Sequence, residues 1–316
     1  MKPLLIVNPR SARGKTGIVF EKMRGPIERH LGHVDVMFTE RPQHAVDIAR
    51  SAALDGRGIV VAVGGDGSIH EVACGLMQAR EQGVKLPRMG IIGAGTGGDY
   101  RRTLGFEDRL DRYCEAITEG QTRTMDIGRF SYVAHDGEKK SSYFINILSA
   151  GVGGLVDQYV AQSPRSLGGT LAYVTSSLKG LARSVVGRLK VSTRREDMSR
   201  EETIETRLIA ICNGRFFGSG MQAAPMASPD DGLFDIIDLG AAPRLRFLAV
   251  NTRMYTGTHI HSLDVKHYRC DHIEIDLLNQ DAADRFLLDV DGEPLGRLPI
   301  TVDMVPSAID IFVPKQ

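Results

Sequence analysis

The sequence carries no excess of charge of either sign, because 39 Lys and Arg residues are matched by 39 Asp and Glu residues. A general nucleic-acid binder usually has a net basic balance, so no nucleic-acid partner is expected. The four cysteines are widely spaced and form no C-x-x-C pair. They give no sign of a zinc site or a disulfide framework, and they fit a reducing cytoplasm.

Long apolar runs are also missing from the sequence. No stretch approaches the roughly 20 apolar residues of a membrane-spanning helix. The apolar run in MKPLLIVNPRS is too short for a signal peptide. We therefore expect a cytoplasmic protein whose contact with a membrane, if it has one, is peripheral. A chain of 316 residues is long for one core, so two domains are expected.

The clearest motif is VAVGGDGSIHEV at residues 61–72. Apolar Ile59–Val63 predicts a buried strand, Gly64–Gly67 ends that strand, and three- and four-residue apolar spacing predicts a helix from Ser68. Such a turn lets backbone N–H groups approach an anion without a Cβ in the way, and the helix N-terminus adds partial positive charge. The motif therefore predicts a phosphate site.

Two side chains of the motif allow other interpretations. Ser68 and Glu71 have the spacing of a capping box, so part of the motif could simply begin a helix. Asp66 would repel a phosphate unless a cation lay between them. We interpret Asp66 as a group linked to magnesium.

Residues 1–125 alternate between strand and helix patterns. The predicted strands are Leu4–Val7, Val34–Phe38, Ile59–Val63 and Met89–Gly93, and the other predicted helices are Gly17–Leu31, Ala45–Leu54 and Glu107–Glu119. This alternation predicts a Rossmann-like α/β nucleotide-binding domain with a parallel sheet. The segments NPRSARGKTG, GGDGS and GAGTGGDY should meet at the carboxyl ends of its strands.

Residues 126–316 have a different pattern, with many short strands bounded by turns. The predicted strands are Ile127–Ala134, Ser142–Leu148, Thr206–Cys212, Phe234–Asp238, His272–Leu277, Phe286–Val290 and Ile300–Met304, and the predicted helices are Leu171–Val186 and Arg244–Thr256. A mostly antiparallel β-sandwich domain is expected. The extreme C-terminus is a candidate to pack back on the first domain.

One segment is locally basic. Between Ala161 and Arg200, eight Lys or Arg residues stand against two acids, a balance of +6. This segment is either a solvated face or a surface for anionic lipid headgroups, which attract clustered cations.

Other motifs are weak when taken alone. NPRSARGKTG nearly makes a Walker A loop, but Pro9 occupies the position of the first glycine. GAGTGGDY matches the dinucleotide pattern G-x-G-x-x-G, but it follows a late strand and no acidic residue ends a strand about twenty positions on. The two carboxylates of Ser228–Leu233 are most simply part of a hairpin turn.

Taken together, these residues resemble the bacterial diacylglycerol kinase-like lipid kinases, which are relatives of the sphingosine and ceramide kinases. The resemblance rests on NPRSARGK, GGDGSIHEV, GAGTGGDY, CNGRFFGSGMQAAPMASPDDGLFDI and LDVDGEPLG, and it runs almost the full length of the chain. GGDGS alone is shared with NAD kinases. Its combination with SPDDGLFD and a late DGEPLG is more specific.

The resemblance implies ATP as co-substrate, Mg2+ as cofactor and a lipid alcohol as acceptor, most simply a diacylglycerol-like lipid at a membrane surface. Glu293 resembles the proton acceptor of the family, Asp291 is the competing candidate, and Asp66 is expected near the nucleotide metal. A structural magnesium is implied at Asp231, with the carbonyls of Ser228 and Leu233. The implied nucleotide contacts are Asn8, Thr39, Gly64, Gly65, Asp66, Gly67, Ser68, Ile69, His70, Glu71, Gly95 and Thr96.

The sequence departs from the family pattern P-x-G-T-G-N-D-F at Ala94, Gly98 and Tyr100. The lost asparagine amide at Gly98 bears on the choice of phosphate donor and lipid. Two alternatives to a lipid kinase therefore stay open. One is an NAD kinase-like enzyme, and the other is a lipid- or nucleotide-binding protein with impaired catalysis. The oligomeric state is also open, with a homodimer as one candidate.

Overall fold

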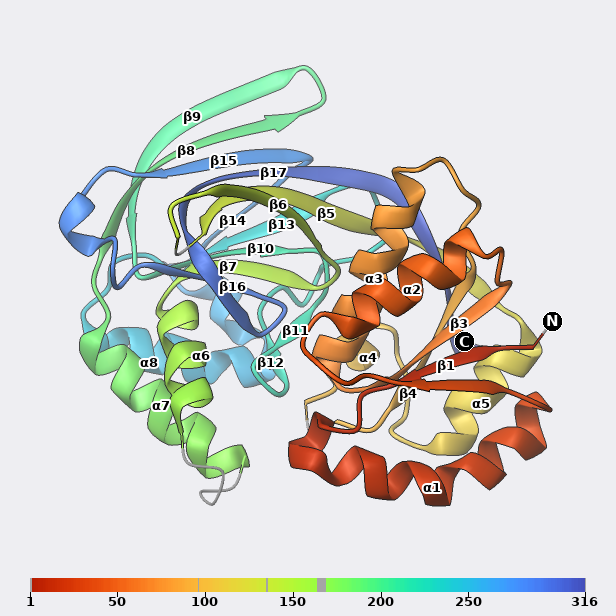
Figure 1. Cartoon of the computed structure of the whole chain (residues 1–316). Helices are drawn as coiled ribbons and strands as arrows, with labels where there is room; N and C mark the ends of the chain where they lie inside the picture. Colours follow the sequence, from red (N-terminus) through yellow and green to blue (C-terminus); the bar gives the residue numbers. More distant parts are fainter. Residues whose placement is uncertain (1, 96, 135, 164–168, 316) are drawn as a thin grey trace. The chain divides into compact units, whose positions relative to one another are not determined.

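The computed structural model describes residues 2–95, 97–134, 136–163 and 169–315. The chain divides into two compact units (Figure 1). Unit 1 comprises residues 1–127 and 306–316, and unit 2 comprises residues 128–305. Strands β5 (Thr122–Ala134) and β17 (Glu293–Phe312) each run through a boundary between the units. The residues from 306 onward therefore complete unit 1.

Unit 1 alternates strands and helices, as predicted. Its other elements are β1 (Leu4–Val7), α1 (Ser11–Leu31), β2 (Asp35–Phe38), α2 (His44–Leu54), β3 (Ile59–Gly64), α3 (Asp66–Arg80), β4 (Arg88–Gly93), α4 (Asp99–Thr103) and α5 (Leu110–Glu119). The strand order is β17-β4-β3-β1-β2, and the pairs are parallel. Helices α2 and α3 lie on one side of this sheet and α1 and α5 on the other (Figure 1). Apolar residues are therefore needed on both faces of the strands, and the α/β prediction is confirmed.

Helix α1 begins at Ser11, earlier than the predicted Gly17. The Ser11 hydroxyl donates to the carbonyl oxygen of Asn8 at 2.9 Å and to Thr16 Oγ1 at 2.6 Å. The Thr16 hydroxyl is buried and donates to the carbonyl oxygen of Ala94 at 2.8 Å. These hydroxyl bonds hold a segment that the sequence suggested would be a loop.

Unit 2 is mostly antiparallel β-structure. Its strands besides β5 and β17 are β6 (Lys139–Phe144), β7 (Ile147–Gly151), β8 (Gly187–Arg195), β9 (Met198–Thr206), β10 (Leu208–Cys212), β11 (Phe216–Phe217), β12 (Met221–Gln222), β13 (Phe234–Asp238), β14 (Lys266–Cys270), β15 (His272–Leu277) and β16 (Leu287–Val290). The main order is β14-β13-β10-β7-β16-β17, from which β15-β8-β9 and β5-β6 branch at β17. The predicted β-rich second domain is confirmed.

The helices of unit 2 are α6 (Val152–Gln162), α7 (Gly169–Arg183), α8 (Arg244–Arg253) and the short 3-10 helices Met254–Thr256, Thr258–His261 and Gln280–Ala282. They contribute to two apolar clusters, with residues of α6 and α8 in one and Ala282 in the other. Val156 of α6 and Phe247 of α8 pack with Ile237 of β13 in one apolar cluster. A second cluster contains Phe144 stacked on Phe234, with ring centroids 5.6 Å apart. Burial of these side chains fixes the strands that carry the candidate site in unit 2.

The basic segment of residues 161–200 is largely compensated where it forms the β8–β9 hairpin. Lys190 pairs with Glu201 at 3.0 Å, and Arg200 pairs with Glu202 at 2.9 Å. The acids that follow residue 200 therefore cancel much of the +6 balance. Arg165 lies outside the described residues. None of the helices in the described part of the chain is long and apolar enough to cross a membrane.

Candidate active site

The carboxyl ends of the parallel strands of unit 1 lie along one edge of the sheet. β3 and β4 stay in register to their last residues, Gly64 and Gly93. The Ala94 N–H donates to the carbonyl oxygen of Gly64 at 2.8 Å, and the Asn8 N–H donates to that of Val63 at 3.1 Å. The segments after β1, β3 and β4 are thus neighbours, as the sequence predicted.

The glycine turns after β3 and β4 touch backbone to backbone. A Cβ built on Gly95 would lie 2.5 Å from the Cα of Gly65. Real side chains cannot approach a backbone atom this closely, so residue 95 needs glycine, whereas a Cβ on Gly65 would make only an ordinary contact with the Cα of Gly95 at 3.5 Å. Gly65 is also the extended N-cap residue of α3, which begins at Asp66 rather than at Ser68. The first N–H groups of a helix have no partner within it, and here they follow directly on this glycine contact.

Gly95→Ala is expected to weaken ATP binding about tenfold, because the new methyl group must push the two turns apart and overpacking costs about 1–3 kcal/mol. Isothermal titration calorimetry with ATP measures this loss. Gly25→Ala is the matched control, since Gly25 lies on the exposed face of α1 and a Cβ there meets only the end of the Arg29 side chain at 3.8 Å. Equal ATP affinity in the two variants would show that the contact between the turns does not shape the site.

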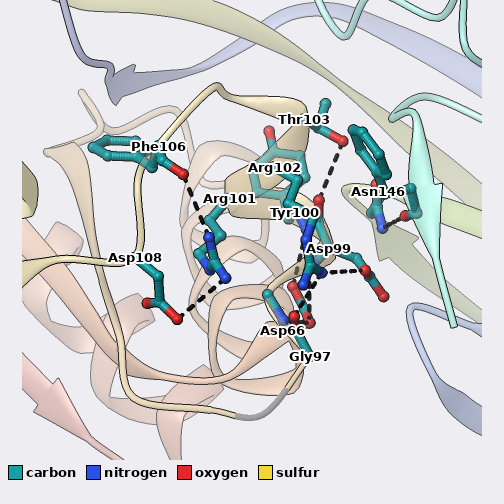
Figure 2. Close-up of polar contacts among 12 residues, drawn as sticks. Asp66, Gly97, Asp99, Tyr100, Arg101, Arg102, Thr103, Phe106, Asp108 and Asn146 are labelled. Carbon is teal, nitrogen blue, oxygen red and sulfur yellow. Dashed lines mark hydrogen bonds and ion pairs between the residues drawn. The ribbon is translucent and has the colours of Figure 1, made fainter. Parts of the chain in front are cut away.

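Asp66 joins the two glycine turns through its carboxylate (Figure 2). Its Oδ2 accepts hydrogen bonds from the N–H groups of Gly98 at 2.7 Å and Asp99 at 3.1 Å. Its Oδ1 accepts from the Tyr100 N–H at 3.0 Å. These three donors open α4 and offset the negative charge, so a carboxylate can lie in this turn without an adjacent cation. The sequence-based link between Asp66 and magnesium stays a prediction.

Two arginines that sequence reasoning missed stabilise the same turn. Arg102 Nη1 donates to the carbonyl oxygen of Gly97 at 2.7 Å and to Asp99 Oδ1 at 2.8 Å. Arg101 pairs with Asp108 at 3.1 Å (Figure 2). The available signal was the DYRR sequence directly after the glycines. These cations place positive charge beside the turn while they hold its shape.

At residue 98 the family pattern has asparagine and this chain has glycine. The backbone conformation at this position is one that both residue types can adopt. Its φ of 71° and ψ of 40° are left-handed. Glycine adopts this conformation freely, and asparagine tolerates it better than most other residues. The N–H of Gly98 binds Asp66 through the backbone. The bond that anchors the turn therefore does not need a side chain at residue 98.

Three of the residues implied as nucleotide contacts point into unit 1. Ser68, Ile69 and His70 are all buried in α3, with at most 5% of each residue exposed. The His70 ring lies 3.6 Å from the sulfur of Cys74. The structure does not bring these three side chains to the surface of the turn, so any contact they make with a nucleotide is through the backbone.

Glu71 caps another helix. Its carboxylate accepts hydrogen bonds from the N–H groups of Gln43 and Ala45, both at 3.2 Å, at the start of α2. The capping-box interpretation of Ser68 and Glu71 is therefore wrong, because Glu71 reaches across to α2 instead of back along α3. Thr39 is buried and its N–H donates to the carbonyl oxygen of Val7 at the sheet edge. Thr96 lies outside the described residues.

A second candidate centre lies in unit 2, at the turn between β16 and β17. Asp291 has a φ of 52°, in the left-handed region. Its Oδ1 accepts from the N–H groups of Asn146 at 3.0 Å and Ile147 at 2.9 Å, and its Oδ2 accepts from that of Ile145 at 2.9 Å. Asp291 thus anchors the break between β6 and β7, which the sequence had suggested was one continuous strand. Its carboxylate thus holds three backbone N–H groups in place, which is a structural role.

Glu293 is half-buried at the start of β17 and pairs with Val290 across the turn. Asp289 supports the same turn, because it is buried and its Oδ1 accepts from the Gly292 N–H at 2.9 Å. Its Oδ2 accepts from the Ser149 hydroxyl at 3.3 Å. Sequence reasoning missed the role of Asp289, although the alternation in DVDGE contained the signal. The choice between Glu293 and Asp291 as the base stays a prediction.

Two buried asparagines hold the strand break beside this turn. Asn213 donates through Nδ2 to the carbonyl oxygen of Ile145 at 2.8 Å. Asn146 donates through Nδ2 to the carbonyl oxygen of Phe216 at 2.8 Å. The N–H groups of Asn213 and Gly214 both donate to the carbonyl oxygen of Asn146 at 2.9 Å. These amides keep the backbone N–H groups of residues 145–147 aimed at Asp291.

The turn implied as a structural magnesium site already has a cation. Arg269 on β14 forms an ion pair with Asp231 Oδ2. Asp231 Oδ1 accepts from the Leu233 N–H at 3.1 Å, and the Ser228 hydroxyl donates to Asp230 at 2.6 Å. Among the described residues no cluster of three or more His, Cys, Asp or Glu could hold a metal. The predicted magnesium site uses one carboxylate and two backbone carbonyls, which such a cluster does not describe, so magnesium at Asp231 stays a prediction.

The four cysteines are free and buried. Burial raises the pKa of Cys114 to about 11 and that of Cys270 to about 12. Burial also raises the pKa of the Cys212 thiol well above its usual range. The nucleophilic thiolate form is scarce at neutral pH for these three groups, so they are poor candidates for a cysteine nucleophile.

Comparison with known sequences covers nearly the whole chain. Residues 2–130 match the family described as diacylglycerol kinase catalytic domain, and residues 146–313 match the YegS C-terminal NAD kinase beta sandwich-like domain. The diacylglycerol kinase of Bacillus subtilis is 28% identical over 275 residues, which is 86% of this chain and 83% of that protein. The Shewanella frigidimarina protein named "Probable lipid kinase YegS-like" is 28% identical over 292 residues, 91% of this chain and 87% of that protein.

Two solved structures show the same fold. A diacylglycerol kinase from Bacillus anthracis matches with a TM-score of 0.69 and 19% identity, over 99% of this chain and 96% of that one. Yeast NADH kinase in complex with NADH matches with a TM-score of 0.52 and 14% identity, over 100% of this chain and 84% of that one. With the β-sandwich family covering more than half of the residues, this chain belongs to the bacterial diacylglycerol kinase-like lipid kinases.

Proposed function

We propose that the protein is an ATP-dependent lipid kinase that transfers the γ-phosphate to the hydroxyl of a diacylglycerol-like lipid. The observation that carries the proposal is the pair of touching glycine turns at the strand edge of unit 1, fastened together by Asp66. This edge presents backbone N–H groups and the start of the 15-residue helix α3. Such an edge suits the phosphates of a nucleotide.

In this proposal Glu293 accepts the proton of the lipid hydroxyl. The hydroxyl oxygen forms a bond to the γ-phosphorus while the bond between that phosphorus and the β,γ-bridging oxygen breaks. The products are a phosphorylated lipid and ADP, and the proton leaves on Glu293. Asp291 positions the turn by holding the N–H groups of residues 145–147. Mg2+ bound to the triphosphate would supply the positive charge that phosphoryl transfer requires.

The experiment is a transfer assay with radiolabelled ATP and mixed micelles that contain diacylglycerol, sphingosine, ceramide or a monoacylglycerol. Labelled diacylglycerol product is the expected result. A label found only on another lipid would support a lipid kinase but show that its acceptor is that other lipid. No labelled lipid with any acceptor, under conditions where the purified protein is folded and binds ATP, would overturn the proposal.

The same assay tests the two alternatives. The fold shared with yeast NADH kinase motivates an arm with NAD as acceptor and no lipid, and phosphorylated NAD formed in that arm would favour an NAD kinase-like enzyme. Calorimetry with ATP tests the second alternative. Nucleotide binding without transfer to any acceptor would identify a binding protein with impaired catalysis.

A further inference from the structure

The segment of unit 2 that contains α8 has no acidic residue from Leu239 to Leu263, while it contains Arg244, Arg246 and Arg253. Helix α8 buries Phe247 and Val250 in an apolar cluster that also contains Ile237 of β13. Leu248 and Asn251 are half-buried, and the other residues of α8, Arg244 and Arg253 among them, are exposed. The outward surface of α8 is therefore basic in a chain whose total charge is zero.

Two leucines on this segment are almost fully exposed. Leu245 has 85% of its surface exposed and Leu263 has 97%. An ion pair at 2.6 Å between Arg246 and Asp264 joins the residues that directly follow these two leucines. The leucines are thus held near the same point of the surface. Single exposed leucines are common on proteins, but two nearby leucines beside several cations form an amphipathic surface.

Cations without acidic partners lie at the start of α8. Arg207 donates to the Ala242 carbonyl oxygen at 2.9 Å and to the Ser184 hydroxyl at 3.3 Å. Arg244 donates to the Ser184 carbonyl oxygen at 3.1 Å. In the described ranges neither guanidinium forms an ion pair with a carboxylate. Burial and the like charge of Arg244 both lower the pKa of Arg207. An anion placed here would relieve this repulsion.

We propose that the α8 surface, defined as Arg207, Arg244, Leu245, Arg253 and Leu263, docks on a bilayer that contains anionic lipids. The leucines enter the interface, and the arginines contact the headgroup phosphates. The charge complementarity supports a bilayer, because anionic leaflets attract cations close to their surface and exposed leucines gain from entering the acyl boundary. The proposal rests on the proposed function, since a diacylglycerol-like acceptor lies in such a bilayer.

Vesicle sedimentation of the full chain tests the α8 surface. Phosphatidylcholine vesicles with and without phosphatidylglycerol are compared, and the wild type is expected to prefer the anionic vesicles. Arg244→Gln and Arg253→Gln should each weaken this binding about fivefold, the equivalent of one lost cation. The double variant Leu245→Ser, Leu263→Ser should weaken it about tenfold. The paired control is Arg195→Gln with Met198→Ser on the exposed end of the β8–β9 hairpin, which should bind like the wild type.

Three results would each overturn the docking proposal. The first is unchanged vesicle binding in the α8 variants, and the second is an equal loss in the hairpin control. The third is release of the protein from vesicles by inorganic phosphate at low concentration, which would make the arginines a site for free phosphate. Circular dichroism checks that each variant is folded. Transfer to a short-chain diacylglycerol in solution should be unchanged in the α8 variants. If the wild type did not phosphorylate the short-chain diacylglycerol, this would count against the proposed function. The vesicle binding of the variants would still test the docking proposal.

Discussion

Glu293→Gln is expected to lower kcat by about 10²–10⁴-fold, the usual contribution of a positioned general base. Glutamine keeps the size and shape of the side chain but cannot accept the proton of the lipid hydroxyl. Since Glu293 is half-buried at the end of a turn that other residues hold, the melting temperature should change little. The measurement is kcat with a fixed lipid acceptor, together with a thermal unfolding curve of the same preparation.

Asp291→Asn separates the two candidate bases. Asparagine would turn an amide N–H toward at least one of the three backbone donors that bind Asp291. Two facing donors cannot form a hydrogen bond, so this variant should unfold at a clearly lower temperature than Glu293→Gln. If Glu293→Gln kept full turnover and Asp291→Asn lost turnover without any loss of stability, the assignment of the base would have to be exchanged.

Asp66→Asn is expected to weaken ATP binding about a hundredfold. The Asp66 carboxylate binds the N–H groups of Gly98, Asp99 and Tyr100. Asparagine can accept with one oxygen only, so at least one donor faces an amide N–H. Each hydrogen bond to a charged group contributes about 1.5–3 kcal/mol, and a hundredfold change in affinity corresponds to about 2.7 kcal/mol. Calorimetric titration with ATP measures the change, and a lower melting temperature should accompany it.

The magnesium dependence of Asp66→Asn distinguishes the two interpretations of this residue. As an anchor of α4, Asp66 affects ATP affinity to the same degree at every Mg2+ concentration. As a metal ligand, it would leave the melting temperature unchanged, and the loss would shrink as Mg2+ is raised. Recovery of wild-type affinity at high Mg2+ would therefore favour the sequence-based interpretation. Arg102→Gln is a useful comparison, because it removes a contact to Gly97 in the same turn and leaves the Asp66 carboxylate in place.

The α/β part of the fold could be predicted because its signals are local. The buried strand β3 ends at a glycine, and helix α3 follows it with apolar residues at three- and four-residue spacing. In unit 2 the β8–β9 hairpin was missed, because Met198–Thr206 is mostly polar and exposed. Helix α6 was missed as well, since its glycines, Gly153 and Gly154, weaken a helical pattern. Tertiary packing, which the sequence pattern does not show, decides these elements.

The candidate site was predicted in composition and not in detail. GGDG and DGE identify the two turns, but the sequence could not show that Asp66 and Asp291 bind backbone N–H groups far along the chain. Both aspartates have the same arrangement of one carboxylate on three successive N–H groups. The partner of Glu71 lies 26 residues away at Ala45, beyond the reach of a capping motif. Long-range bonds of this kind depend on which strands are neighbours.

The path of β17 affects how unit 1 forms during synthesis. Its Ile311 pairs with Met89 of β4, so an edge of the parallel sheet is supplied by residues translated after all of unit 2. A ribosome-bound chain that has emerged only to residue 127 would expose the apolar side of β4. Such a nascent chain should need a chaperone, and an excised fragment of residues 1–127 should aggregate unless the peptide 306–316 is added in trans.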